Sequence, residues 1–143
     1  MTEQHFRNLE ELYVTAPINA LYKPEIQVSN KECRITAPVL KELYHGGGSL
    51  HGSVYFKMLD DSAFFAAQSV ETVFFLLTAQ FNINLFRPVI GGEIKATGRV
   101  LVTSRQQYSC ESELIDEKGK LVAKGQGIFM KSSMPLEKLF RRA

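Results

Sequence analysis

The sequence predicts an α+β fold in which an antiparallel sheet packs against one long buried helix. Residues 52–70 are apolar around most of a helical wheel, which is typical of a helix enclosed by other elements. From residue 72 onward, runs with β-type alternation are separated by short turns. With 143 residues, 45% of them hydrophobic, the chain is long enough for one domain with its own core. We therefore expect residues 1–143 to form a single domain.

The first third of the chain predicts a helix followed by short strands. Residues 3–14 place apolar side chains at helical spacing, namely Phe6, Leu9, Leu12 and Tyr13. The runs EIQVS and CRITAPV within residues 25–39 predict a hairpin or two short strands. A glycine-rich loop then leads into the long helix, so that loop and helix together occupy residues 45–70.

The second half predicts four consecutive strands. An unbroken odd-numbered apolar row from Val73 to Leu85 predicts one long half-buried strand. Further strands are expected over about 93–104, 107–116 and 120–131. Because tight turns join antiparallel neighbours, residues 72–131 are expected to form a meander. The segment 135–143 is expected to be a frayed basic end rather than a final half-turn of helix.

Composition excludes several classes of protein. The formal net charge is only +2 and the cations are dispersed, which argues against a nucleic-acid partner. No apolar run reaches the roughly 20 residues of a membrane span, and acidic residues near the N-terminus argue against a targeting signal. Cys33 and Cys110 lie far apart in predicted strands, as expected for free thiols in a reducing compartment. We therefore expect a cytoplasmic protein with no membrane partner.

Spacing also excludes several kinds of site. Three histidines and two cysteines are too scattered for a zinc cluster, so no metal is expected. The glycine loop lacks the Lys-Ser/Thr end of a phosphate loop, and His51 stands where a dinucleotide motif requires its last glycine. Ser49 does not lie in a nucleophile elbow. The junction of loop and helix remains as the candidate site.

The two adjacent aspartates of the long helix are not equivalent. At 100° per residue, Asp60 shares the apolar face with Leu59 and Ala63, whereas Asp61 lies on a polar stripe with Lys57. We expect Asp61 to form a solvated ion pair with Lys57. A carboxylate on an apolar face is costly, which favours a functional role for Asp60 over a purely structural bond to a neighbouring element.

The start of the same helix offers backbone donors. The N–H groups of Gly52 and Ser53 are first-turn donors at the positive end of the helix dipole, suited to a carbonyl oxygen that gains negative charge. His51 or Ser49 can instead simply cap this end. Asp60 lies eight residues beyond Gly52, roughly 12 Å along the axis, too far to act on a carbon held at Gly52. Two helices packed antiparallel about a twofold axis would join Asp60 of each copy to Gly52 of the other, which predicts an obligate homodimer.

These residues resemble a known family. The run Gly48-Ser49-Leu50-His51-Gly52-Ser53, with Asp60 nine residues after His51, is similar to the G-x-L-H-G-G motif and helix aspartate of the PaaI-type (phenylacetic-acid-degradation) acyl-CoA thioesterases. Residues 81–88 followed by Gly91-Gly92-Glu93 resemble that family's strand, x-P and Gly-Asp/Glu turn. The likeness covers roughly residues 32–131. It implies the hotdog fold, a five- or six-stranded antiparallel sheet wrapped around the long helix, with dimers that can pair into tetramers.

The resemblance also implies roles for single residues. Asp60 matches the carboxylate that activates water or attacks the thioester, and Gly52 matches the donor that polarises its carbonyl. His45 stands where many members have an asparagine that holds the lytic water, Thr78 stands where a Ser or Thr assists, and His51 matches a motif histidine that is often architectural. Ser53 departs from the second glycine of the motif and His45 from the asparagine, so His45 can equally be an ordinary loop histidine. The helix aromatics are expected to be mostly core, and Phe64, one turn after Asp60, is the best placed of them to touch an acyl chain.

The leading hypothesis is hydrolysis of an acyl-CoA thioester by a homodimer with composite sites, possibly a dimer of dimers. It uses no metal or redox cofactor, and CoA enters only as part of the substrate. One alternative is a hotdog hydratase or dehydratase that pairs His45 or His51 with Asp60 on a 3-hydroxyacyl thioester. Another is a non-catalytic acyl-CoA binding protein, which the departures at Ser53 and His45 leave open. The sequence does not decide whether Arg87, Arg105 or Lys131 contacts the CoA phosphates; all three are strand-end cations, and an ordinary surface role is favoured for each.

Overall fold

The computed structural model describes residues 2–140 as one six-stranded sheet with four α-helices and a short 3-10 helix. The helices are α1 (Thr2–Val14), α2 (Asn19–Tyr22), α3 (Gly52–Gln68) and α4 (Leu136–Phe140), and the 3-10 turn η1 spans Lys41–Leu43. The strands are β1 (Glu25–Ser29), β2 (Glu32–Pro38), β3 (Phe74–Leu85), β4 (Glu93–Thr103), β5 (Gln107–Ile115) and β6 (Leu121–Pro135).

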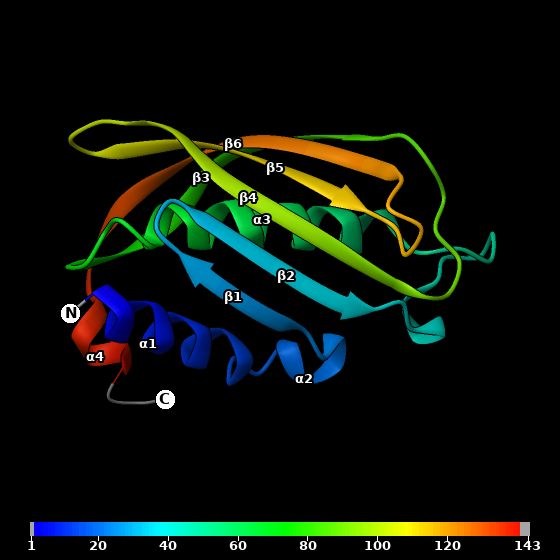
Figure 1. Cartoon of the computed structure of the whole chain (residues 1–143), viewed down its shortest axis with the longest axis horizontal. Coiled ribbons are helices and arrows are strands. Elements are labelled where there is room, and N and C mark those ends of the chain that lie inside the picture. The colour runs from blue at the N-terminus through cyan, green and yellow to red at the C-terminus, as the bar shows by residue number, and fades with distance from the viewer. Residues whose placement is uncertain (1, 141–143) are drawn as a thin grey trace.

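The sheet is antiparallel throughout, with the strand order β1-β2-β4-β5-β6-β3. It curves over α3, which contacts all six strands, while α1, α2 and α4 lie at one side (Figure 1). This is the hotdog fold that the resemblance implies. The predicted meander is correct for β4 to β6 and wrong for β3, because β3 pairs with β6 and residues 86–92 cross over to β4. As a result, β3 is an edge strand.

The predicted alternation along β3 is wrong at its start and correct for Phe81 and Ile83, which pack against the core. Leu76 is fully buried, whereas Leu77 is 54% exposed and Val73 57% exposed. The ladder to β6 shifts between Thr78 and Gln80, so inward positions are even before this bulge and odd after it. Within the ladder, Phe81 fills the space that a side chain at Gly125 or Gly127 would occupy. The bulge therefore directs Leu76 and Phe81 toward the same core.

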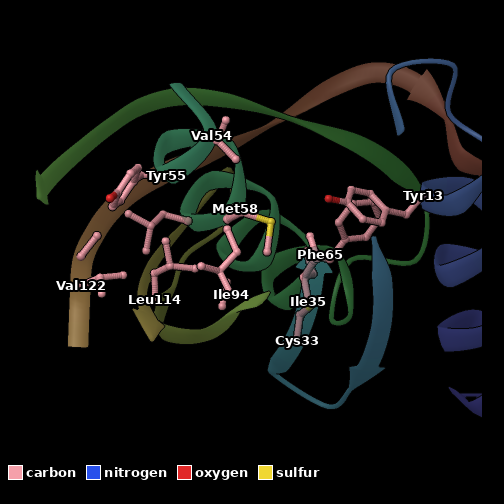
Figure 2. Packing of buried hydrophobic residues seen from close by; sticks show 14 of the residues in the cluster. Tyr13, Cys33, Ile35, Val54, Tyr55, Met58, Phe65, Ile94, Leu114 and Val122 are labelled. Atoms are coloured by element: carbon pink, nitrogen blue, oxygen red, sulfur yellow. The ribbon is translucent and has the colours of Figure 1, made fainter. Parts of the chain in front are cut away.

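The core forms where α3 lies on the sheet. Figure 2 shows Met58 of α3 beside Ile94 and Leu114, and Tyr13 of α1 beside Phe65. The rings of Tyr13 and Phe65 lie 5.1 Å apart. At Gly98 of β4, a Cβ atom would collide with the backbone of Ser62, so the helix approaches this strand more closely than any side chain permits.

The ends of the chain pack together. The helix predicted over 3–14 is confirmed as α1, and it contacts α4 through His5 and Phe140, whose rings lie 6.2 Å apart. The expectation of a frayed end is wrong for residues 136–140, because burial of Leu136 fixes this turn as α4. Residues 141–143 lie outside the described part of the chain. The predicted free thiols are confirmed, since Cys33 and Cys110 are both buried and unpaired.

Candidate active site

Asp60 projects from the middle of α3 toward β3. The Thr78 hydroxyl donates a hydrogen bond of 2.9 Å to Asp60 Oδ1, so the structure brings together two residues that the sequence separates by 18 positions. Burial raises the pKa of Asp60 to about 6; the charge of Asp61 adds to this rise, while the Thr78 bond and Lys57 oppose it. The carboxylate is therefore available as a base near neutral pH.

Asp61 forms the predicted ion pair with Lys57, but the pair is not solvated. Lys57 Nζ lies 2.6 Å from Asp61 Oδ2, and the two side chains are only 13% and 19% exposed. The Tyr13 hydroxyl donates a second bond of 2.6 Å to the same oxygen, and the ammonium also lies over the Tyr13 and Tyr22 rings. Lys57 stands three residues before Asp60, yet its hydrogen bond is to Asp61.

An apolar cavity of about 570 Å³ adjoins Asp60. Phe64, Phe65 and Phe75 form part of its wall, and Thr78 lies beside them. Segments distant in sequence complete it, with contributions from Leu12, Ala16, Pro17, Ile18, Met134 and Leu139. The sequence pattern indicates Phe64 but not these residues, because no local signal reveals that α1 and α4 reach the same cavity.

The loop before α3 is closed by its own side chains. His45 Nδ1 accepts a hydrogen bond from the Gly47 N–H, and its Nε2 lies 3.0 Å from the Ser49 hydroxyl. With Nδ1 as an acceptor, the neutral ring carries its proton on Nε2 and donates it to Ser49. Gly48 adopts φ +87°, a left-handed conformation that glycine accommodates without strain. Both nitrogens of His45 are therefore engaged within the loop.

His51 caps the helix, one of the two possibilities that the sequence left open. Its Nδ1 accepts a 3.0 Å bond from the Ser53 N–H and lies 2.8 Å from the Ser53 hydroxyl. The expectation that Ser53 offers a free donor is therefore wrong. Within residues 2–140, no acceptor takes a hydrogen bond from the Gly52 N–H, so this group alone remains available at the helix start.

Gly52 opens on a second cavity of about 380 Å³, which His45 also lines. No described residue lines both this cavity and the one beside Asp60. The two halves of the predicted site thus lie at separate places along α3 in one copy of the chain. Gly52 and His45 come together, as do Asp60, Thr78 and Phe64, but the two groups do not meet.

No helix within residues 2–140 is both long and apolar enough to cross a membrane. In the same range, no group of three or more His, Cys, Asp or Glu side chains is arranged to hold a metal ion.

Two sequence comparisons match the chain to known proteins. Residues 47–123, more than half of the chain, match the family model described as the thioesterase superfamily. One relative is a protein of Saccharolobus solfataricus that is provisionally named an esterase. It is 28% identical over 129 residues, which cover 87% of this chain and 91% of that protein.

Solved structures share the fold. The Escherichia coli PaaI protein of the phenylacetic acid degradation operon superposes with a TM-score of 0.85 at 19% identity, covering 94% of this chain and 97% of its own. A conserved protein of Pseudomonas aeruginosa gives 0.79 at 27% identity, with coverages of 85% and 98%. A thioesterase of Haemophilus influenzae gives 0.77 at 20% identity, with coverages of 87% and 88%.

Proposed function

Because the chain belongs to the thioesterase superfamily, we propose that it hydrolyses acyl-CoA thioesters at two composite sites of a homodimer. The observation that carries this proposal is the division of the site along α3. Asp60 and Thr78 lie beside an apolar cavity, whereas the unpaired Gly52 N–H opens on a different one. Neither half by itself provides both a base and an oxyanion donor.

Strand β3 supports the assembly of the two halves. Thr78, near its start, contacts Asp60, and Leu85, at its end, lies next to Gly52. This strand is an edge of the sheet, so its outer backbone groups can pair with a second copy. Antiparallel pairing about a twofold axis near Phe81 would bring the Thr78 end of one strand to the Leu85 end of the other. The same operation would bring Asp60 of one copy to Gly52 of its twin.

The proposed reaction needs no group beyond these side chains and water. Asp60 takes a proton from a water molecule whose oxygen bonds to the thioester carbon, and the negative charge that develops on the carbonyl oxygen is held by the Gly52 N–H of the second copy. The carbon–sulfur bond then breaks, and the CoA thiolate leaves and is protonated. Direct attack by Asp60 would instead form an anhydride that water cleaves in a second step.

The other site residues have supporting roles in this proposal. Thr78 holds the Asp60 carboxylate in place, and His51 and Ser53 fix the start of α3. Both nitrogens of His45 are engaged within its loop, so we assign it to loop shape; to hold water it would have to release Ser49. Phe64 is placed to contact the acyl group.

A thiol-release screen over short, medium, long and aromatic acyl-CoA substrates tests the proposal, with Asp60→Asn as the matched control. We expect release by the native protein and a loss of at least about 100-fold in Asp60→Asn, with the dimer retained. Equal rates for the two proteins would refute the role of Asp60.

The same panel separates the alternatives. Thermal stabilisation by acyl-CoA without thiol release would identify a binding protein. Hydration of crotonyl-CoA in place of thiol release would identify a hydratase.

A further inference from the structure

The cavity beside Gly52 continues into a groove formed by two connections of the sheet. Arg87 and Pro88 line both spaces, so the two meet at the end of β3. The groove, of about 400 Å³, lies between the crossover 86–92 and the β5–β6 turn 116–120. Both segments lie at the end of the molecule that carries the loop before α3 (Figure 1). A thioester held at Gly52 could therefore extend its CoA portion directly into this groove.

The groove holds three cations with no carboxylate within 4.0 Å among residues 2–140. These are Arg87, Lys118 and Lys120, all exposed. Two acidic residues also line it, but one oxygen of Asp116 is occupied by the N–H groups of Lys118 and Lys120. The basic side chains therefore remain available to an anionic ligand.

Other cations that the sequence suggested are less suitable. Lys131 is only 3.3 Å from the buried carboxylate of Glu71 and is held there. Arg105 lies in the turn between β4 and β5 and lines neither the Gly52 cavity nor the adjoining groove. Of the three candidates, Arg87 alone adjoins the Gly52 cavity.

Exposed apolar side chains flank the cations. Phe86 is 53% exposed and lines the Gly52 cavity, and Ile90 is 72% exposed and lines the groove. An exposed ring next to cations suits a ligand with both a planar base and phosphates, because every base can stack on an aromatic face. A groove of this volume is typical of a small-molecule site.

We propose that Arg87, Lys118 and Lys120 bind the phosphates of the CoA nucleotide, with Phe86 and Ile90 beside its base. This assignment rests on the proposed function and fixes the orientation of the substrate in the composite site. The acyl group enters the apolar cavity beside Asp60 of one copy, and the nucleotide lies in the groove of the copy that supplies Gly52.

The experiment compares two substrates with the same acyl group, an acyl-CoA and the acyl-pantetheine thioester that lacks the nucleotide. The test variant is Arg87→Gln/Lys118→Gln/Lys120→Gln. The control variant, Lys23→Gln/Arg105→Gln/Lys138→Gln, removes the same charge at exposed positions outside the groove. We expect the test variant to raise KM for acyl-CoA about tenfold with kcat unchanged, because each exposed charge pair contributes modestly. For acyl-pantetheine, which lacks the nucleotide, the test variant should lower kcat/KM much less than for acyl-CoA, and the control variant should change kcat/KM for neither substrate.

Binding of CoA itself, measured by calorimetry against pantetheine, gives a second readout that requires no turnover. The test variant should weaken CoA binding about tenfold, and the control should not. Equal effects of the two variants, or equal effects on CoA and pantetheine, would overturn the groove assignment while thiol release by the native protein still stands. A rate loss confined to acyl groups carried on an acyl carrier protein would also overturn it, in favour of a protein partner.

Discussion

The pKa of Asp60 is set by opposing effects of its surroundings. Burial and the charge of Asp61 favour the protonated form, whereas Thr78 and Lys57 favour the carboxylate. The bond from Lys57 to Asp61 leaves Asp60 with Thr78 as its hydrogen-bond donor within residues 2–140. A carboxylate placed in this way is a stronger base than an exposed aspartate and is still ionised at neutral pH.

Hydrolysis should therefore slow down as the pH falls below the pKa of Asp60. With the pKa of Asp60 at about 6, kcat/KM should decrease about tenfold per pH unit well below pH 6, because only the ionised carboxylate accepts a proton. A pH–rate profile between pH 4.5 and 8 measures this limb. A profile that is flat through pH 5 would contradict the assignment.

Substitutions of Thr78 and Asp61 should shift the acidic limb of the pH–rate profile in opposite directions. Thr78→Val removes a bond that lowers the pKa of Asp60, so the limb should shift to higher pH, and Thr78→Ser should restore it. Asp61→Asn removes a charge that raises this pKa, so the limb should shift to lower pH. Rates that drop without any shift in the profile would indicate a purely structural role for both residues.

The same environment affects stability. The pKa of Asp60 is higher in the folded protein than in the unfolded chain, so the folded state binds more protons between about pH 4 and 6 and this group's contribution falls as the pH rises through that window. Asp60→Asn should therefore raise the free energy of unfolding by on the order of 1 kcal/mol at pH 7.5. Thermal unfolding at pH 7.5 and 4.5 tests this, because the gain should be smaller at pH 4.5, which lies inside that window, and should vanish only below about pH 4. An unchanged or lower Tm at pH 7.5 would contradict it.

At the scale of the element, α3 presents different chemistry at its start and at its middle. His51 has φ −65° and ψ 141° and caps the helix, leaving Gly52 as the first helical residue. A cap of this kind orients the Gly52 N–H without using it. The polar end of the helix and the partly buried carboxylate of Asp60 thus lie on one rigid element.

Replacing Gly52 by proline should remove the donor and leave the helix intact. Proline is favoured at the first helical position, and the extended conformation of His51 is the one that a following proline requires. We expect kcat to fall by about 10²–10³. Gly52→Ala keeps the N–H, and the added Cβ would meet only Leu85 at 3.4 Å, so it should remain active. Similar activity of both variants would exclude this donor.

The sequence predicted some elements better than others for physical reasons. Helix α3 and the position of Asp60 on it follow from periodicity, which is a local property. The partner of β3 and the bulge after Thr78 depend on how Phe81 fits over Gly125 and Gly127, which belong to a distant strand. Likewise, α4 owes its order to the burial of Leu136, and the walls of the Asp60 cavity come from both ends of the chain. Such contacts leave no periodic signal.

At the scale of the whole molecule, the proposed site requires two copies of the chain. Light scattering should give twice the 16.1 kDa of one chain, or four times if dimers pair. A monomer that remains fully active at nanomolar concentration would contradict the composite site.

Mixing two inactive variants gives a more direct test. Asp60→Asn supplies an intact Gly52, and Gly52→Pro supplies an intact Asp60. When the two are co-expressed, half of the dimers are mixed and each has one complete site, so about a quarter of the native activity should return. The controls are cells in which both gene copies encode the same variant, so that all of the dimers carry two identical chains. Failure of the mixture to exceed them would show that each site lies within one copy.

The contact at Gly98 has a consequence for large-scale mutagenesis. Any side chain there strikes the backbone of Ser62, so substitutions at Gly98 should score as badly in an activity selection as those at Asp60. The two positions would differ in abundance, because a chain altered at Gly98 fails to accumulate while one altered at Asp60 accumulates normally. A survey that reads cellular protein level beside growth would therefore separate the residue that shapes the scaffold from the residue that performs chemistry.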